Sequence, residues 1–246
     1  MGDTDKRCVL QGDGAVTQLV ISEVFGPTVQ GEGPSTGEPC AFVRTSNCNL
    51  DCVWCDTPYT WDWTRFDKDK EQTTVLVEDV YARLQEMGVR RVVFSGGEPL
   101  LQQEALGELA ERLDGWAIEV ETNGTIPPKE PLRSRAQFNV SIKLPHAQTT
   151  ANPVRPVAVR EFADMARSDM LVYFKWVAAD PSDVDRIREF AEQWDLPRNS
   201  IWVMPLGTTR DAIVERSTRL ADAIVRNGFH ASTRMHVLMW GDKRGH

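Results

Sequence analysis

Short apolar runs alternate with longer amphipathic stretches along the chain from residue 18 onward. The run 92–95 ends in Gly96-Gly97, and the run 118–122 ends at Asn123-Gly124. Short apolar runs bounded by such turn residues are typical of buried strands. The pattern therefore predicts strands at 92–95, 118–122, 138–142, 171–177, 201–204 and, in the apolar tail, 236–240.

Helical periodicity follows several of these runs. One apolar face is formed by Leu101, Ala105, Leu106, Leu109, Ala110 and Leu113. A second is formed by Val184, Ile187, Phe190, Ala191 and Trp194, with Ser182 as the expected N-cap and Asp185 three residues later. A third helix is expected over 209–227, with Ile213, Leu220 and Ile224 facing inward and Gly228 as its stop.

Strands that alternate with helices of this length predict a mostly parallel sheet. About six such units without a dinucleotide-binding glycine fingerprint indicate an α/β fold, a partial (β/α)6 TIM-like barrel, with its chemistry at the carboxyl ends of the strands. Residues 1–17 are expected to form an N-terminal extension and 18–246 a single domain. The proline-rich stretches 127–131 and 145–156 are expected to be connections.

Composition and charge limit the classes of ligand that the chain is expected to bind. The 246 residues carry a net charge of −8 without a block of lysine or arginine, which argues against nucleic acid and favours a small-molecule ligand. The N-terminus lacks the apolar core of a signal peptide, and no run approaches the ~18 apolar residues of a membrane span. We therefore expect a cytoplasmic protein that does not bind membranes.

Three of the five cysteines fall within eight residues: Cys48, Cys52 and Cys55, in the spacing C-x3-C-x2-C. This spacing suits one iron–sulfur cluster, and three thiolates leave one of four irons open for a chelating ligand. Two alternatives remain: a structural zinc site completed by His146, His230 or His236, and three ordinary buried thiols. The remaining cysteines, Cys8 and Cys40, are expected to be plain thiols.

The triplet resembles the signature of the radical S-adenosylmethionine (radical SAM) superfamily, since the aromatic Trp54 precedes the last cysteine and a Ser-Gly-Gly-Glu-Pro segment follows at 95–99. The resemblance implies a 4Fe-4S cluster whose open iron chelates S-adenosylmethionine. One electron from the cluster then cleaves the cofactor to a 5′-deoxyadenosyl radical. No side chain is assigned as catalytic, because the cofactor supplies the radical.

A narrower resemblance rests on the segment 23–33 (EVFGPTVQGEG), on Phe42-Val43-Arg44 and on Cys55-Asp56-Thr57. These segments are similar to the 7-carboxy-7-deazaguanine synthase family, and supporting matches at 121–124, 141–143, 204–207 and 236–245 extend the similarity over nearly the whole chain from residue 19. The resemblance implies conversion of 6-carboxy-5,6,7,8-tetrahydropterin to 7-carboxy-7-deazaguanine with loss of ammonia. Ile142 and Leu206 stand where relatives often have proline and glutamate.

The resemblance also implies site residues. Those expected to bind the pterin are Val29, Gln30, Gly31, Glu32, Arg44, Ser95, His236 and His246. Those expected to bind S-adenosylmethionine are Trp54, Cys55, Asp56, Gly97, Glu98, Glu121, Ser141, Ile142, Lys143, Met204, Pro205, Leu206 and Gly207. Thr57 matches a magnesium (Mg²⁺) ligand. The residue types suit the substrate, because a carboxylate such as Glu32 can accept two N–H groups of a pterin edge and Arg44 can bind a carboxylate.

The family further implies a homodimer and a one-electron donor of the flavodoxin or ferredoxin type. Two alternatives remain for function: another radical SAM enzyme, such as a glycyl-radical activase, and a non-catalytic zinc or iron–sulfur module. Whether the product enters queuosine in tRNA or a deazapurine natural product stays open.

Overall fold

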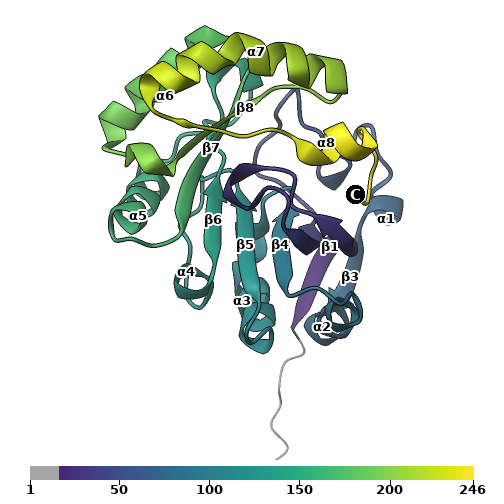
Figure 1. Ribbon diagram of the computed structural model, residues 1–246. Coiled ribbons are helices and arrows are strands. Elements are labelled where there is room, and N and C mark those ends of the chain that lie inside the picture. The colour runs from purple at the N-terminus through teal and green to yellow at the C-terminus, as the bar shows by residue number, and fades with distance from the viewer. Residues whose placement is uncertain (1–16) are drawn as a thin grey trace, which may run out of the picture.

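The computed structural model describes residues 17–246, which form one nine-stranded sheet in the order β3-β1-β2-β4-β5-β6-β7-β8-β9 (Figure 1). The strands are β1 (Gln18–Val29), β2 (Pro39–Thr45), β3 (Thr73–Leu76), β4 (Arg91–Gly96), β5 (Ala117–Thr122), β6 (Gln137–Val140), β7 (Val172–Ala178), β8 (Ile201–Pro205) and β9 (His230–Ala231). The predicted extension over 1–17 lies outside the described residues except for Thr17, and a single domain over 18–246 stays a prediction.

From β2 onward every neighbouring pair of strands is parallel, whereas β1 pairs antiparallel with both β2 and β3. The mostly parallel sheet predicted from the alternating pattern is therefore confirmed. Because parallel strands share one direction, their carboxyl ends meet at the same edge. The β2–β4 register sets Arg44 opposite Ser95 at that edge.

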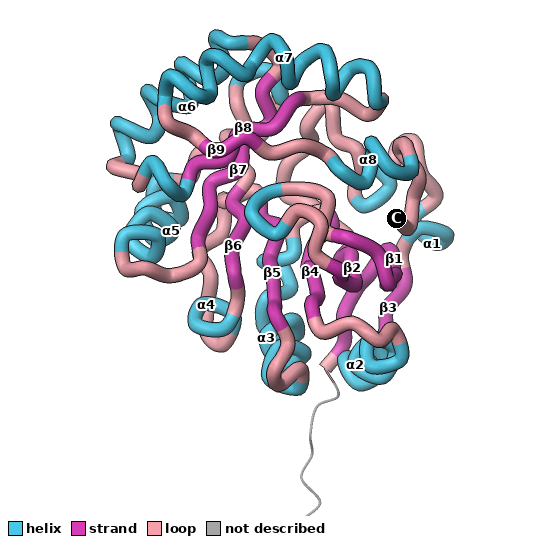
Figure 2. Tube along the Cα trace, viewed as in Figure 1, coloured by secondary structure: helices cyan, strands magenta, loops and turns pink. Residues whose placement is uncertain are grey.

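The helices are α1 (Lys68–Glu71), α2 (Val77–Glu86), α3 (Gln103–Arg112), α4 (Leu132–Arg135), α5 (Pro156–Arg167), α6 (Pro181–Trp194), α7 (Arg210–Asn227) and α8 (Met235–Trp240). Helices α2 to α7 follow the outside of the curved row of strands, and α8 lies near α1 and the C-terminus (Figure 2). This arrangement is the partial TIM-like barrel that the sequence predicts. The largest fully buried side chains are Trp176, Phe94, Phe138, Phe162 and Phe174. Among residues 17–246, no helix combines the length and apolarity needed to cross a bilayer.

Four local predictions are wrong. Helix α6 is capped by Asp180, whose carboxylate accepts the Ser182 backbone N–H at 2.8 Å, so Ser182 lies inside the first turn. Leu101 is 46% exposed, because it precedes α3 in a 3-10 turn and does not share its inward face. The strand expected over 138–142 ends at Val140, and the segment 236–240 is helical. An apolar run this short does not distinguish strand from helix by its pattern.

Candidate active site

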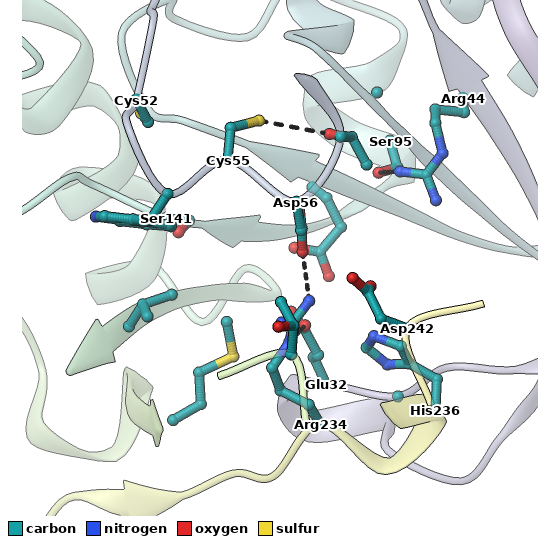
Figure 3. A pocket seen from close by; sticks show the side chains of 18 of the residues that line it. Glu32, Arg44, Cys52, Cys55, Asp56, Ser95, Ser141, Arg234, His236 and Asp242 are labelled. Atoms are coloured by element: carbon teal, nitrogen blue, oxygen red, sulfur yellow. Dashed lines mark hydrogen bonds and ion pairs between the residues drawn. The ribbon is translucent and has the colours of Figure 1, made fainter. Parts of the chain in front are cut away.

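A cavity of about 760 Å³ opens where the carboxyl ends of the parallel strands meet the α8 segment. Cys52 and Cys55 lie on one side, while Glu32, Arg234 and His236 lie on the other, with Asp56 between them (Figure 3). We call the first side the cysteine wall (48–55 and Thr57, with Gly96-Gly97). We call the second the charged wall (Glu32, Asp56, Glu121, Lys175 and Arg234).

The cysteine wall is a loop that leaves the end of β2 and turns tightly through the triplet. The backbone N–H of Cys55 donates to the Cys52 carbonyl at 3.1 Å, and that of Leu50 donates to Cys48 Sγ at 3.4 Å. All three cysteines line the cavity. Burial raises the pKa of the Cys48 thiol to about 12 and also raises that of Cys52. Metal ligation requires thiolates, so loading this loop with a cluster releases protons.

The cysteine loop suits a 4Fe-4S cluster in its chemistry, because it presents three thiols and N–H groups aimed at two of their sulfurs. Within residues 17–246, no three His, Cys, Asp or Glu side chains lie close enough to hold a single metal ion. Of the histidines considered for zinc, His146 packs on Trp54 beside the cysteine loop, with ring centroids 5.8 Å apart, and His230 stacks on Trp202. His236 belongs to the opposite side of the cavity.

The Gly96-Gly97 turn packs directly against the start of the cysteine loop. A Cβ at Gly97 would lie 2.0 Å from the Asn47 carbonyl oxygen, and one at Gly96 would lie 2.2 Å from that of Thr45. Gly96 also has φ +139°, which L side chains rarely adopt. Only glycine therefore lets the β4 turn approach the cysteine loop so closely.

Glu98 does not line the cavity, although it was expected to bind the cofactor. Its carboxylate is fully buried and accepts the backbone N–H groups of Leu100 (3.0 Å) and Asn123 (2.7 Å) and the Thr122 hydroxyl (2.8 Å). Burial raises its pKa. Glu98 thus ties the ends of β4 and β5 together beneath the cysteine wall. Ile142 is likewise buried and is not part of the lining.

The charged wall is an alternating chain of ions, in which Lys175 and Arg234 are buried, Glu32 and Glu121 are largely buried, and Asp56 is exposed. Lys175 Nζ lies 2.7 Å from Glu32 Oε2 and 2.6 Å from Glu121 Oε2, and Arg234 Nε lies 2.8 Å from Glu32 Oε1. Arg234 also pairs with Asp56 and donates to the Gly207 carbonyl at 2.7 Å. Burial acting alone would raise the pKa of Glu32, but the two cations and His236 outweigh it and lower that pKa. Glu32 is therefore an anion.

Glu121 differs from Glu32 in its surroundings. Burial raises its pKa, and Lys175 offsets this only in part. Its Oε1 accepts N–H groups from Gln30 at 3.2 Å and Asn139 at 3.0 Å. The same two amides donate to Glu119, at 3.2 and 3.1 Å, so Gln30 links β1 to the centre of the sheet.

Arg44 points into the cavity beside Ser95. Its Nε donates to Glu23 Oε1 at 2.7 Å, and its Nη1 lies 3.5 Å from Ser95 Oγ. Glu23 also accepts the Tyr59 hydroxyl at 2.9 Å. One edge of the guanidinium is thus anchored, and the group remains on the cavity lining.

The α8 segment closes the cavity against Gly31. The Met235 backbone N–H donates to the Gly31 carbonyl at 2.8 Å, and a Cβ at Gly31 would lie 2.0 Å from His236 Nδ1. Burial lowers the pKa of His236. Glycine at position 31 therefore permits His236 to reach the lining. His246, at the end of the chain, lines the cavity too and packs on Trp240.

With the exceptions of Glu98 and Ile142, the structure brings every residue expected from the resemblance to this one cavity, including Thr57, whose Oγ1 lies 3.7 Å from Cys55 Sγ. Five further residues line the cavity and were not predicted from the sequence: Lys175, Arg234, Asn123, Tyr59 and Trp61. The sequence does mark Lys175 as unusual, because it is the one charged residue in the apolar strand Val172–Ala178. No comparable sequence feature marks Arg234.

Comparisons with known proteins agree with this geometry. The family model described as the radical SAM superfamily matches residues 42–157. The 7-carboxy-7-deazaguanine synthase of Pyrobaculum aerophilum is 34% identical, over 94% of this chain and 99% of the relative. The enzyme of the same name from Halobacterium salinarum is 33% identical, over 97% and 96%. The crystal structure of QueE from Escherichia coli superposes with a TM-score of 0.67 at 26% identity, covering 89% of this chain and 95% of that one.

These matches favour a 7-carboxy-7-deazaguanine synthase over a glycyl-radical activase or a non-catalytic metal module. Membership of the radical SAM superfamily also implies a 4Fe-4S cluster and S-adenosylmethionine as cofactors. The cysteine wall, the cavity and the near full-length similarity thus lead to one conclusion: the chain belongs to the 7-carboxy-7-deazaguanine synthase family of radical SAM enzymes.

Proposed function

We propose that this chain converts 6-carboxy-5,6,7,8-tetrahydropterin to 7-carboxy-7-deazaguanine and ammonia, a carbon–nitrogen lyase reaction. The observation that carries the proposal is one cavity with thiols on one wall, a Glu32 carboxylate paired with Lys175 and Arg234 on the other, and an anchored Arg44 at the side. Such a cavity matches a flat polar substrate that carries a carboxylate.

Glu32 and Arg44 orient the substrate. A carboxylate has about four lone-pair sites, and Lys175 and Arg234 each occupy one of those of Glu32, so two N–H groups of a pterin edge can still bind. Arg44 and Ser95 receive the substrate carboxylate, while Val29, Gln30 and Gly31 provide backbone contacts. His236 in α8 and His246 in the tail beyond it cover the substrate.

Cys48, Cys52 and Cys55 hold the cluster. When bound, the cluster and S-adenosylmethionine supply the radical that removes a hydrogen atom from the substrate. The residues proposed to bind S-adenosylmethionine are Trp54, Cys55, Asp56, Gly97, Glu121, Ser141, Lys143, Met204, Pro205, Leu206 and Gly207, all on the cavity lining. Glu98 and Ile142 support these contacts from beneath.

Thr57 is the proposed Mg²⁺ ligand, with substrate oxygens and water completing an oxygen-rich coordination shell. Mg²⁺ would orient the substrate and polarise its oxygens. We further propose that residues 18–246 act as one domain in a cytoplasmic homodimer, which receives single electrons from a flavodoxin- or ferredoxin-type donor.

The test is an anaerobic assay. The protein is reconstituted with iron and sulfide, then given dithionite, S-adenosylmethionine, Mg²⁺ and 6-carboxytetrahydropterin, and mass spectrometry follows 7-carboxy-7-deazaguanine. Product is expected, and its yield should fall when Mg²⁺ is removed. Cleavage of S-adenosylmethionine without product would reject the substrate, and neither reaction in a fully loaded protein would reject the enzyme.

A further inference from the structure

Trp61 directs its indole N–H at a cluster-binding cysteine. Its Nε1 donates to Cys55 Sγ at 3.4 Å, an N–H···S hydrogen bond between residues six positions apart. Both residues line the cavity. Nothing in the family motif or in the proposed chemistry assigns this contact a role.

The turn that carries Trp61 is anchored to the sheet. The backbone N–H of Asn47, just after β2, donates to the Thr60 carbonyl at 2.7 Å, and the Ser46 hydroxyl donates to the same oxygen at 3.2 Å. Thr60 itself is fully buried, and its hydroxyl donates to the Thr57 carbonyl at 2.8 Å. These bonds fix the residue next to Trp61, so the indole is held against Cys55 by the fold.

The other tryptophan on the cavity is placed differently. Trp54 Nε1 is buried and has no hydrogen-bond partner among residues 17–246, and its ring packs on His146 and under the Lys143 ammonium, 5.4 Å away. Trp54 therefore contacts His146 and Lys143 through its ring, whereas Trp61 donates its indole N–H to a sulfur atom. Cys48 receives donors too, from Leu50 N at 3.4 Å and more distantly from Asn123 Nδ2 at 3.9 Å.

We propose that Trp61 is a positioning residue that raises the reduction potential of the cluster through its hydrogen bond to Cys55 Sγ. The inference rests on the cysteine triplet holding the cluster, as in the proposed function. Reduction adds one electron from the donor and makes the cluster one unit more negative, with no bond made or broken. A donor on a ligating sulfur stabilises the more negative state, and hydrogen bonds to sulfur are among the factors that set cluster potentials.

The experiment is an EPR-monitored redox titration of the reconstituted protein without substrate, comparing wild type with Trp61→Phe. Phenylalanine keeps an aromatic ring and removes the N–H. We expect the reduction equilibrium to become about tenfold less favourable, which corresponds to a potential about 59 mV lower for one electron. The matched control is Trp63→Phe, two residues along the same segment and off the cavity lining, whose potential should not change.

A second measurement detects the hydrogen bond itself. In wild-type protein labelled with ¹⁵N-indole tryptophan, the reduced cluster should show a ¹⁵N hyperfine coupling in pulsed EPR. That coupling should vanish when Trp61 is replaced by the isosteric benzothienylalanine. A loaded Trp61→Phe cluster with unchanged potential, or a labelled protein without the coupling, would overturn the inference. Failure to form deazaguanine with both signals present would reject the proposed function alone, and failure of wild type to load a cluster would overturn both.

Discussion

The two walls of the cavity differ in their residue types and in how the chain builds them. The cysteine wall is made almost entirely by one loop, with thiols, backbone N–H groups and tightly packed glycines. The charged wall is assembled from five ions on different parts of the chain, where Glu32 meets Lys175 across 143 positions and Arg234 across 202. One wall is therefore local in sequence and the other is created only by folding.

The two walls also differ in what stabilises their charged groups. Burial raises the pKa values of Cys48 and Cys52, so these thiols need metal to be stable as thiolates. The ions of the charged wall are already paired with one another before any ligand binds. We infer that the cysteine wall is completed by its cofactor, whereas the charged wall is complete in the polypeptide. Each prediction below tests this contrast, beginning with the largest effect.

Cys52→Ala is expected to abolish cluster binding, cleavage of S-adenosylmethionine and product formation, while leaving the fold and the charged wall in place. One thiolate of three is lost, and no other cysteine side chain lines the cavity in the part of the chain described here. Iron and sulfide content, the cluster absorbance and product yield measure the outcome. Cys40→Ala is the matched control, because Cys40 is buried in β2 away from the cavity. A loaded Cys52→Ala protein would show that the triplet is not the ligand set.

Lys175→Met is expected to destabilise the chain by about 3–5 kcal/mol, because it leaves Glu32 and Glu121 as buried carboxylates without their shared cation. Lys175 is 3% exposed, so solvent cannot replace the ammonium. Denaturant unfolding of the metal-free protein measures the loss.

The double variant Lys175→Met with Glu121→Gln is the control, since it also removes the charge of Glu121, whereas Glu32 still pairs with Arg234. We expect it to recover part of the lost stability, and the cluster should load in both variants. Equal stability of the single variant and wild type would mean that the charged wall is not complete without ligand.

The difference between local and long-range features also separates what could be predicted from the sequence from what could not. The triplet is a short motif, and Gly96-Gly97 directly follows the apolar run 92–95, so spacing and apolar runs were enough to predict the cysteine motif, the glycine turn and strand β4. Strand β2, which precedes the triplet, was not predicted. The ion pairs of Lys175 and Arg234 were not predictable, because a charge in a strand or a tail carries no information about a partner that only the folded sheet brings within 3 Å. Similarly, the apolar tail 236–240 gave no means of choosing between strand and helix.

Arg44→Lys tests the side of the cavity where the two walls meet. Lysine keeps the charge but loses the planar fork that binds Glu23 through Nε and leaves the other nitrogens for a carboxylate. A hydrogen bond to a charged group contributes about 1.5–3 kcal/mol, so kcat/KM for the pterin should fall about 10- to 100-fold. Cleavage of S-adenosylmethionine without substrate should stay at the wild-type rate. A fall in that rate as well would place Arg44 in the cofactor site.

The smallest expected effect concerns the C-terminal tail, which the folded chain holds beside the charged wall by contacts at the protein surface. Arg244 Nη1 pairs with Glu71 at 2.7 Å and its Nε with Glu23 at 3.2 Å, and the guanidinium lies 4.0 Å from the Tyr59 ring centroid. The side chain is 44% exposed, so solvent screens these pairs and Arg244→Ala should cost about 1 kcal/mol or less in global stability.

Residues 242–246 nevertheless line the cavity. When a loss of about 1 kcal/mol acts only on the docking of the tail, the equilibrium between docked and undocked tail changes by about fivefold. We therefore expect faster hydrogen exchange confined to the tail and a KM for the pterin raised by up to about fivefold, with unchanged unfolding. Arg65→Ala, which removes a more exposed pair with Asp62, should change neither quantity. If the tail exchanges faster in Arg244→Ala while the KM stays constant, the tail does not contribute to substrate binding, and the charged wall is complete without it.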